Sequence, residues 1–142
     1  MSVVWAAFDR LLGRDVALKL LRPDRSPDEG RLMQEFALLS SLDHPGIVTV
    51  RDVGLAGDTL YLATDLVGGV TLDRWLATSP SQADCVGVAT DLLATVGWLH
   101  RQGVIHADMK PANILVEQTE HGCWPTIIDF GLDKHLHKRR KI

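Results

Sequence analysis

The chain has 142 residues, of which 46% are hydrophobic and 23% charged, a composition typical of a folded globular protein. Its formal net charge is −3, and residues 134–142 carry five of the fifteen basic residues, so the body of the chain is acidic. An acidic body argues against nucleic acid as a partner. Two cysteines, Cys85 and Cys123, are too few for a disulfide framework and favour the cytoplasm, and no apolar run is long enough for a membrane span.

The first 66 residues contain four strand patterns and one helix pattern. Residues 3–8 and 15–21 predict an antiparallel hairpin, and residues 47–55 and 59–66 predict two further strands. Between them, Ser26 and Pro27 predict the start of a helix whose apolar residues continue to Leu39. We therefore expect a four-stranded antiparallel sheet with one helix. The glycine pair at residues 68–69 predicts a hinge after it.

Helix patterns dominate the next part of the chain. Residues 71–77 predict a short helix, and a longer one begins at Ser81 or Gln82 and ends at Gln102, before Gly103. Residues 114–116 and 126–128 predict short strands joined by a polar turn that contains Gly122 and Pro125. The longer helix has an expected apolar face made of Val86, Ala89, Leu92, Leu93, Val96 and Leu99.

Polar groups suited to phosphoryl transfer are concentrated in two predicted loops. The first loop contains His106, Asp108, Lys110 and Asn113, and the second reads Asp-Phe-Gly from Asp129. Together they offer a carboxylate that can accept a hydroxyl proton, an ammonium beside the transferring phosphate and two oxygen ligands for Mg²⁺. The spacing His-x-Asp-x-Lys-x-x-Asn, preceded by a long helix and followed by Asp-Phe-Gly, is far more specific than a lone His-x-Asp.

These motifs closely resemble the catalytic and metal-binding loops of eukaryotic-type (Hanks-type) Ser/Thr protein kinases, and the resemblance extends over about residues 2–132. It implies a protein-kinase-like α+β fold. Residues 1–66 would form an antiparallel β small lobe with one helix, residues 67–133 a truncated and mainly helical large lobe, and residues 134–142 a basic tail. The resemblance also implies ATP and Mg²⁺ as cofactors and a protein with Ser/Thr hydroxyls as the substrate.

The resemblance assigns roles to the loop residues. Asp108 would hydrogen-bond the substrate hydroxyl and take its proton late, and Lys110 would neutralise charge on the γ-phosphoryl group. Asn113 and Asp129 would bind Mg²⁺ through oxygen. His106 is expected to be structural, with its ring hydrogen-bonded to the backbone around the metal loop.

Lys19 ends the stretch Val-Ala-Leu-Lys, which is similar to the kinase strand Val-Ala-Ile-Lys whose ammonium contacts the α- and β-phosphates of ATP. The alternative is an ordinary strand lysine that faces water. Glu35 is the expected carboxylate partner of Lys19, and Glu29 is its competitor for that role. Glu35 could also be a solvated helix acid paired with Arg31.

The resemblance also implies an apolar slot for adenine with backbone contacts at one edge. Each apolar residue of the slot could instead be plain core. The expected slot has Val4 and Ala17 as its roof, Leu115 as its floor, Thr64 as the gatekeeper, and the main chain of Asp65, Leu66 and Val67 as the hinge.

Three departures from the family pattern affect the expected function. The Gly-rich loop is missing, with Val4 matching its last residue, so nucleotide should bind weakly. Ala107 replaces the usual Arg, so gating by a phosphorylated activation loop is not expected. The activation segment and later helices are absent, so apolar side chains of the long helix would be exposed to aggregation or to a partner chain that covers the truncated large lobe.

Three functions are compatible with these residues. The favoured one is a Ser/Thr protein kinase. The second is a catalytically inactive kinase-like module for nucleotide binding or interaction. The third is a small-molecule phosphotransferase of the aminoglycoside type, against which Lys110 and Phe130 argue because such enzymes resemble kinases but generally differ at both positions.

Overall fold

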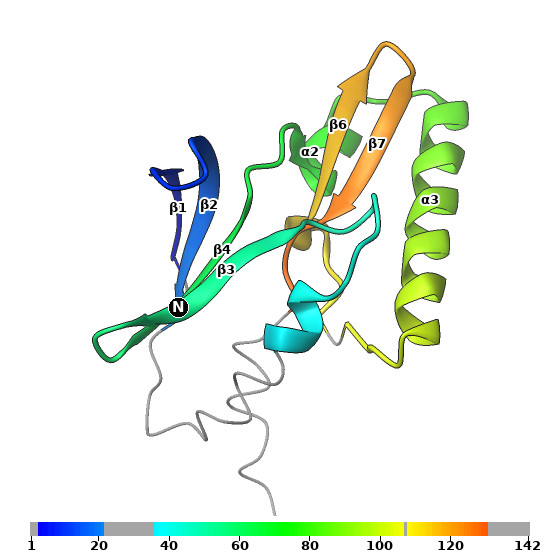
Figure 1. The fold of residues 1–142 in the computed structure, drawn as a ribbon. Helices are drawn as coiled ribbons and strands as arrows, with labels where there is room; N and C mark the ends of the chain where they lie inside the picture. The colour runs from blue at the N-terminus through cyan, green and yellow to red at the C-terminus, as the bar shows by residue number, and fades with distance from the viewer. Residues whose placement is uncertain (1–2, 22–35, 107, 131–142) are drawn as a thin grey trace, which may run out of the picture. The chain divides into compact units, whose positions relative to one another are not determined.

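The computed structural model describes residues 3–21, 36–106 and 108–130, which form two compact units (Figure 1). Within the described ranges, the first unit contains residues 3–21, 36–43 and 49–66. The second contains residues 44–48, 67–106 and 108–130. None of the helices in these ranges is long and apolar enough to cross a membrane.

The first unit is built on a four-stranded antiparallel sheet with the order β1-β2-β4-β3 (Figure 1). β1 (Val3–Asp9) and β2 (Arg14–Leu21) form one hairpin, and β3 (Val50–Ala56) and β4 (Thr59–Asp65) form another. Gly13 and Gly57 have φ values of 65° and 62° in the two turns, a backbone region that glycine enters at little cost. The four-stranded antiparallel sheet expected from the sequence is therefore confirmed.

The predicted strand start at Ile47 is wrong. β3 begins at Val50, whereas Ile47 forms a parallel bridge with Ile127 in the second unit. The N–H of Val48 donates to the Ile127 carbonyl at 2.9 Å, and the N–H of Ile127 donates to the Gly46 carbonyl at 2.9 Å. Because an apolar run suits either arrangement, its hydrophobicity does not reveal which partner it pairs with.

The predicted helix after Ser26 is described only at residues 36–40, which are helical. Phe36 and Leu39 are buried, as expected for its apolar face. The earlier part of this helix, including Glu29 and Glu35, lies outside the described residues.

The second unit combines helices with a three-stranded sheet of order β5-β6-β7 (Figure 1). Its helices are α2 (Leu72–Ala77), α3 (Gln82–Arg101) and the short 3₁₀ helix η1 (Pro111–Asn113). Its strands are β5 (Val70–Thr71), β6 (Ile114–Thr119) and β7 (Gly122–Ile127). The described part of this unit is thus more helical than β, in agreement with the expected large lobe of a kinase fold.

Local signals explain the ends of α3. The Ser81 hydroxyl accepts a hydrogen bond from the Asp84 N–H at 3.1 Å and caps the first turn. After the last helical residue, Gly103 has a φ of 75°, which ends the helix without the penalty that a side chain would add. The start agrees with the sequence prediction, and the helix ends at Arg101, one residue before the predicted end at Gln102.

The core of the second unit contains Trp75 of α2, Val88 of α3 and Val116 of β6. Partly buried residues pack against this cluster, namely Leu72, Cys85, Leu92 and Cys123. The cluster holds the β6–β7 hairpin against both helices, and Figure 1 shows α3 running beside β7.

The predicted apolar face of α3 is only partly right. Leu99 is buried, but Val86 and Leu93 are 59% and 74% exposed, and Val88 and Thr95 are buried instead. The helix carries two apolar stripes, and periodicity alone does not tell which stripe faces the sheet.

Pro125 lies inside β7, opposite Val116, rather than in the turn as predicted. Proline lacks an N–H group and is tolerated in a strand mainly at a sheet edge. β7 is the edge strand of this sheet, so the proline fits there. The β6–β7 hairpin is consequently longer than the sequence indicated.

A substitution at Gly46 tests how closely residues 44–48 pack against α3. A Cβ atom at this position would clash with the side chain of Thr95, so Gly46→Ala should lower the free energy of unfolding by about 1–3 kcal/mol, measured by urea denaturation. The matched control is Gly87→Ala on α3, where a Cβ meets nothing within 4 Å and the stability should rise by up to about 1 kcal/mol. Adding Thr95→Ala to Gly46→Ala should recover much of the lost free energy of unfolding. An unchanged free energy of unfolding in Gly46→Ala alone would contradict this close packing.

Candidate active site

In the first unit, the strand register places the predicted nucleotide-binding side chains on one face of the sheet. Val4 lies opposite Lys19, and Ala17 lies opposite Thr64. Directly paired residues share a face, as do residues two apart on one strand. Val4, Ala17, Lys19 and Thr64 therefore share a face across three adjacent strands.

Lys19 is buried, with only 7% of its surface exposed. The alternative of an ordinary strand lysine facing water is therefore wrong. Burying an ammonium is costly unless it meets polar or charged partners, so its position on this face calls for such partners. The predicted partner, Glu35, lies outside the described residues.

Asp65, the last residue of β4, is held by two arginines. The Nε and Nη2 atoms of Arg51 bond its two carboxylate oxygens at 2.6 and 2.7 Å, and Arg14 Nη1 lies 3.6 Å from Oδ1. The hydrogen bonds from Arg51 lower the pKa of Asp65, although burial opposes this effect, and the same pair raises the pKa of Arg51. The sequence alone does not single out Arg51, because only the pairing of β3 with β4 shows which carboxylate it meets.

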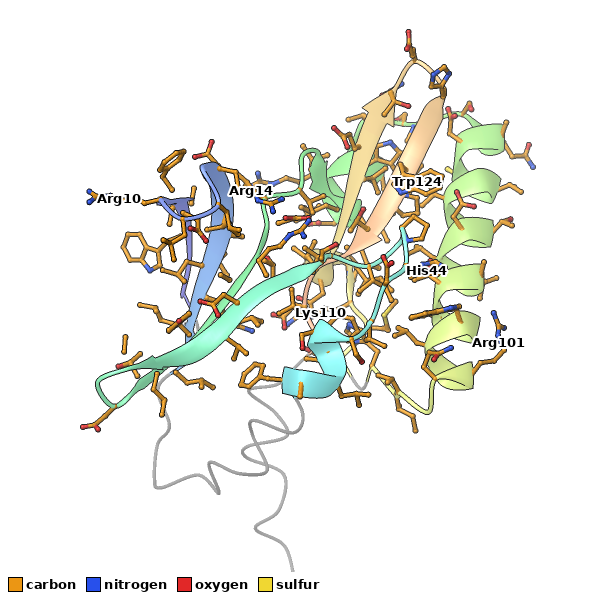
Figure 2. The ribbon with its side chains drawn as sticks, in the orientation of Figure 1. Arg10, Arg14, His44, Arg101, Lys110 and Trp124 are labelled. Atoms are coloured by element: carbon orange, nitrogen blue, oxygen red, sulfur yellow. The ribbon has the colours of Figure 1, made fainter. Side chains whose placement is uncertain are left out.

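In the second unit, Asn113 connects the residues of the predicted catalytic loop. Its Nδ2 donates to the backbone carbonyl of Asp108 at 2.9 Å and to the Asp108 carboxylate at 3.2 Å. Lys110 Nζ lies 3.5 Å from the same carboxylate oxygen. The Asp108 side chain is only 11% exposed, whereas that of Lys110 is 50% exposed. Lys110 is labelled in Figure 2.

Backbone hydrogen bonds connect this loop to the predicted metal loop. The N–H of Asn113 donates to the Lys110 carbonyl at 2.9 Å and closes the turn that begins at Pro111. The N–H of Ile128 donates to the Asn113 carbonyl at 3.0 Å. Asp129 directly follows Ile128, so the hydrogen bond between Ile128 and Asn113 holds the backbone immediately before Asp129.

His106 and Phe130 form a buried pair beneath these loops. Their ring centroids are 5.0 Å apart, and His106 Nδ1 accepts a hydrogen bond from the Asp108 N–H at 3.2 Å. Burial lowers the pKa of His106, while the backbone and carboxylate of Asp129 and the carboxylate of Asp108 oppose this shift. A neutral ring that supports the loop backbone agrees with the structural role expected for His106.

The donor set of the second unit fits Mg²⁺. The NH₂ group of Asn113 is bonded to two acceptors on Asp108, and the amide oxygen is the atom of this carboxamide that can act as a cation ligand. Asn113 and Asp129 thus offer one amide oxygen and one carboxylate. Oxygen ligands of this kind are those Mg²⁺ prefers, usually with phosphate oxygens completing the shell.

The predicted site residues thus form two sets, one in each unit. Asp108, Lys110 and Asn113 are brought together directly, and Asp129 is connected to them through the backbone. Leu115 on β6 and Val67 are half-buried members of the second unit. Val4, Ala17, Lys19 and Asp65 belong to the first. That both sets meet around one nucleotide stays a prediction.

The sequence matches the family model described as "Protein kinase domain" over residues 1–142. The chain belongs to this family. The antiparallel sheet of the first unit and the helices and hairpin of the second correspond to part of a protein-kinase fold.

The chain is similar to curated Ser/Thr protein kinases from bacteria. It is 37% identical to PkaA of Streptomyces coelicolor, covering 84% of this chain and 23% of PkaA. It is 32% identical to PrkC of Bacillus subtilis (93% and 21% covered) and 36% identical to PknB of Mycobacterium tuberculosis (96% and 23% covered). The chain therefore spans less than a quarter of the length of these three relatives.

Two solved structures resemble the described fold. A crystal structure of Rad53 in complex with AMP-PNP matches with a TM-score of 0.81 at 26% identity, covering 92% of this chain and 35% of that one. The apo form of PpkA-294 matches with a TM-score of 0.75 at 24% identity, covering 95% and 56%. The second likeness supports the fold alone.

The lowered pKa of His106 predicts a loss of stability in acid. In the unfolded chain the ring titrates near 6.5, so below that pH the unfolded state binds more protons than the folded state, and the free energy of unfolding falls. The slope from one such group is at most about 1.4 kcal/mol per pH unit. His106→Asn, which keeps an acceptor near Nδ1, should flatten the pH dependence of urea denaturation between pH 7.5 and 5.5.

His121→Asn is the matched control, because the His121 side chain is 88% exposed. This variant should keep the pH dependence of the unmodified chain. A His106→Asn variant with an equally steep dependence would show that the buried ring is not the group responsible.

Proposed function

We propose that this chain carries the nucleotide-binding and catalytic residues of a Ser/Thr protein kinase that transfers the γ-phosphoryl group of ATP to Ser/Thr hydroxyls of proteins. The observation that carries the proposal is the cluster in which Asn113 and Lys110 both approach the Asp108 carboxylate. A carboxylate, a movable ammonium and an oxygen ligand for a cation within one loop suit phosphoryl transfer. The kinase names of the curated relatives support the same chemistry.

In this proposal, Asp108 orients the substrate hydroxyl and accepts its proton. Asn113 holds both the backbone carbonyl and the carboxylate of Asp108, so little reorganisation is needed as the hydroxyl attacks. Because the transition state of phosphoryl transfer is loose, a weakly basic carboxylate is sufficient. Lys110 sits half-exposed beside it and can neutralise charge on the phosphoryl group that is transferred.

The nucleotide would be held by residues of both units. Lys19, oriented by Glu35, would contact the phosphates, and Asn113 and Asp129 would hold Mg²⁺, which neutralises charge on the phosphate oxygens when bound. Adenine would lie against Val4, Ala17 and Leu115, with its edge on the main chain of Asp65 and Val67. The shared face of Val4, Ala17 and Lys19 supports this arrangement, as does the AMP-PNP bound to the similar Rad53 structure.

Three further expectations stay predictions: a protein substrate with Ser/Thr hydroxyls, a partner chain over the large lobe and a cytoplasmic location. A catalytically inactive nucleotide-binding module is the other candidate, because the chain spans less than a quarter of the length of the kinases PkaA, PrkC and PknB. The two candidates differ in one measurable property. Both bind nucleotide, and only the kinase transfers phosphate.

Asp108→Asn tests the proposed catalytic residue. It should lower phosphoryl transfer from radiolabelled ATP to a Ser/Thr-rich peptide pool by at least about 100-fold, because the hydroxyl loses its proton acceptor. Binding of AMP-PNP with Mg²⁺, measured by calorimetry, should change little. The control Asp58→Asn makes the same chemical change in the β3–β4 turn and should keep full transfer. Transfer that survives in Asp108→Asn would refute the role, and nucleotide binding without transfer by the unmodified chain would favour the inactive module.

Lys19→Ala tests the proposed phosphate contact. It should weaken the binding of AMP-PNP with Mg²⁺ by about tenfold or more, since a charge-assisted contact to phosphate is worth about 1.5–3 kcal/mol. Adenosine, which lacks phosphates, should bind the variant and the unmodified chain alike. Arg10→Ala, which removes a positive charge from the exposed β1–β2 turn, is the control (Figure 2). An unchanged affinity in Lys19→Ala would count against the assignment.

A further inference from the structure

β3 contains an irregularity at Arg51. Val50 pairs with Thr64 and Asp52 pairs with Ala63, so two steps along β3 correspond to one step along β4. Arg51 is therefore the extra residue of a β-bulge. Bulges turn a side chain away from its regular direction and occur often beside functional sites. This bulge lies at the end of β4 that the proposed function assigns to adenine.

The bulged residue is bonded to the last residue of β4. Both carboxylate oxygens of Asp65 accept from the Arg51 guanidinium, at 2.6 and 2.7 Å, which fixes the direction of the carboxylate as well as its distance. Arg14 approaches the same carboxylate from β2, and Figure 2 shows it at the start of that strand. The side chain of Asp65 is thus occupied by protein partners and is not expected to contact nucleotide itself.

The main chain around Asp65 is held by further hydrogen bonds. Its N–H donates to the Thr49 carbonyl at 3.0 Å, and its carbonyl accepts from the Thr64 hydroxyl at 3.3 Å. With the side chain bonded to Arg51, the peptide group that follows Asp65 has little freedom to rotate. A fixed peptide presents its carbonyl oxygen in one direction only.

We propose that Arg51 is a positioning residue that fixes the Asp65 main chain and thereby sets the preference of this site for adenine over guanine. The inference rests on the proposed function. Adenine carries an amino group at position 6, which donates to a carbonyl, whereas guanine carries an oxygen there, which a carbonyl repels. A carbonyl with a fixed direction accepts from adenine and repels guanine, so it distinguishes the two bases. A carbonyl that can rotate turns away from the guanine oxygen and therefore discriminates less.

This role is separable from stability. The side chains of Arg51 and Asp65 are 32% and 31% exposed, and partly exposed ion pairs contribute little to folding. Removing the pair should therefore leave a folded chain with a changed choice of base. A purely structural pair would instead change the thermal midpoint and leave base preference as it was.

The test compares the affinities for AMP-PNP and GMP-PNP, each with Mg²⁺, by calorimetry on the full chain well below its thermal midpoint. Arg51→Met should reduce the adenine-to-guanine affinity ratio by about fivefold, which corresponds to about 1 kcal/mol. Asp65→Ala should have a similar effect, and the double variant should lose no more than either single one, because both remove the same interaction. Arg51→Lys should lie in between, since an ammonium lacks the guanidinium fork.

Tyr61→Phe is the matched control. It removes another side-chain hydrogen bond between β4 and β3, from Tyr61 to Asp52 at 2.9 Å, without touching Asp65. This variant should keep the ratio of the unmodified chain. An unchanged ratio in Arg51→Met, or an equal loss in Tyr61→Phe, overturns the positioning role while leaving the proposed function intact. If the unmodified chain binds neither nucleotide, the proposed function fails and the inference fails with it.

Discussion

The candidate site in the second unit depends on the hydrogen bonds of one buried residue, Asn113. Its side chain bonds the backbone and the carboxylate of Asp108, its N–H closes the turn from Lys110, and its carbonyl receives the N–H of Ile128. One residue therefore holds the carboxylate that we propose as catalytic, the loop that carries Lys110 and the strand end that precedes Asp129. A side chain without an N–H donor at this position would lose the hydrogen bonds to the Asp108 carbonyl and carboxylate, and losing one partner of a buried hydrogen bond costs about 1–3 kcal/mol. The chemistry proposed for this site also requires the Asp108 carboxylate and its loop to be held in place.

His106 supports the same loop from below through a different interaction. The ring accepts the Asp108 N–H and packs on Phe130, so the backbone of the catalytic loop is held between Asn113 and an aromatic layer. A neutral imidazole suits this layer, because a charged ring would lose more hydration on burial than the nearby carboxylates return. Structural support and catalytic geometry are thus carried by neighbouring residues of one short sequence motif.

The features that the sequence predicted correctly are set by local chemistry. The ends of α3 follow from Ser81 and Gly103, whose capping roles involve only the adjacent turn. The face of α3 that is buried depends on which stripe meets the sheet, and the exposure of Leu93 shows that an apolar pattern does not decide this. Ile47 likewise pairs with a residue 80 positions away rather than extending β3. Arg51 was missed for the same reason, because its bulge exists only once β3 and β4 are paired.

Asp65 and Asp108 illustrate how one residue type can serve two purposes. The Asp65 carboxylate meets a rigid guanidinium fork, which lowers its pKa and fixes its position, so the role proposed for this residue is one of its main chain. The Asp108 carboxylate meets a carboxamide and a half-exposed ammonium 3.5 Å away. A carboxamide holds an oxygen in place without supplying a full charge, and a lysine stem can move when a substrate arrives. The first arrangement suits a residue that must not change during a reaction. The second suits one that must accept a proton, and this difference in partners, rather than the aspartate itself, separates the two roles that we propose.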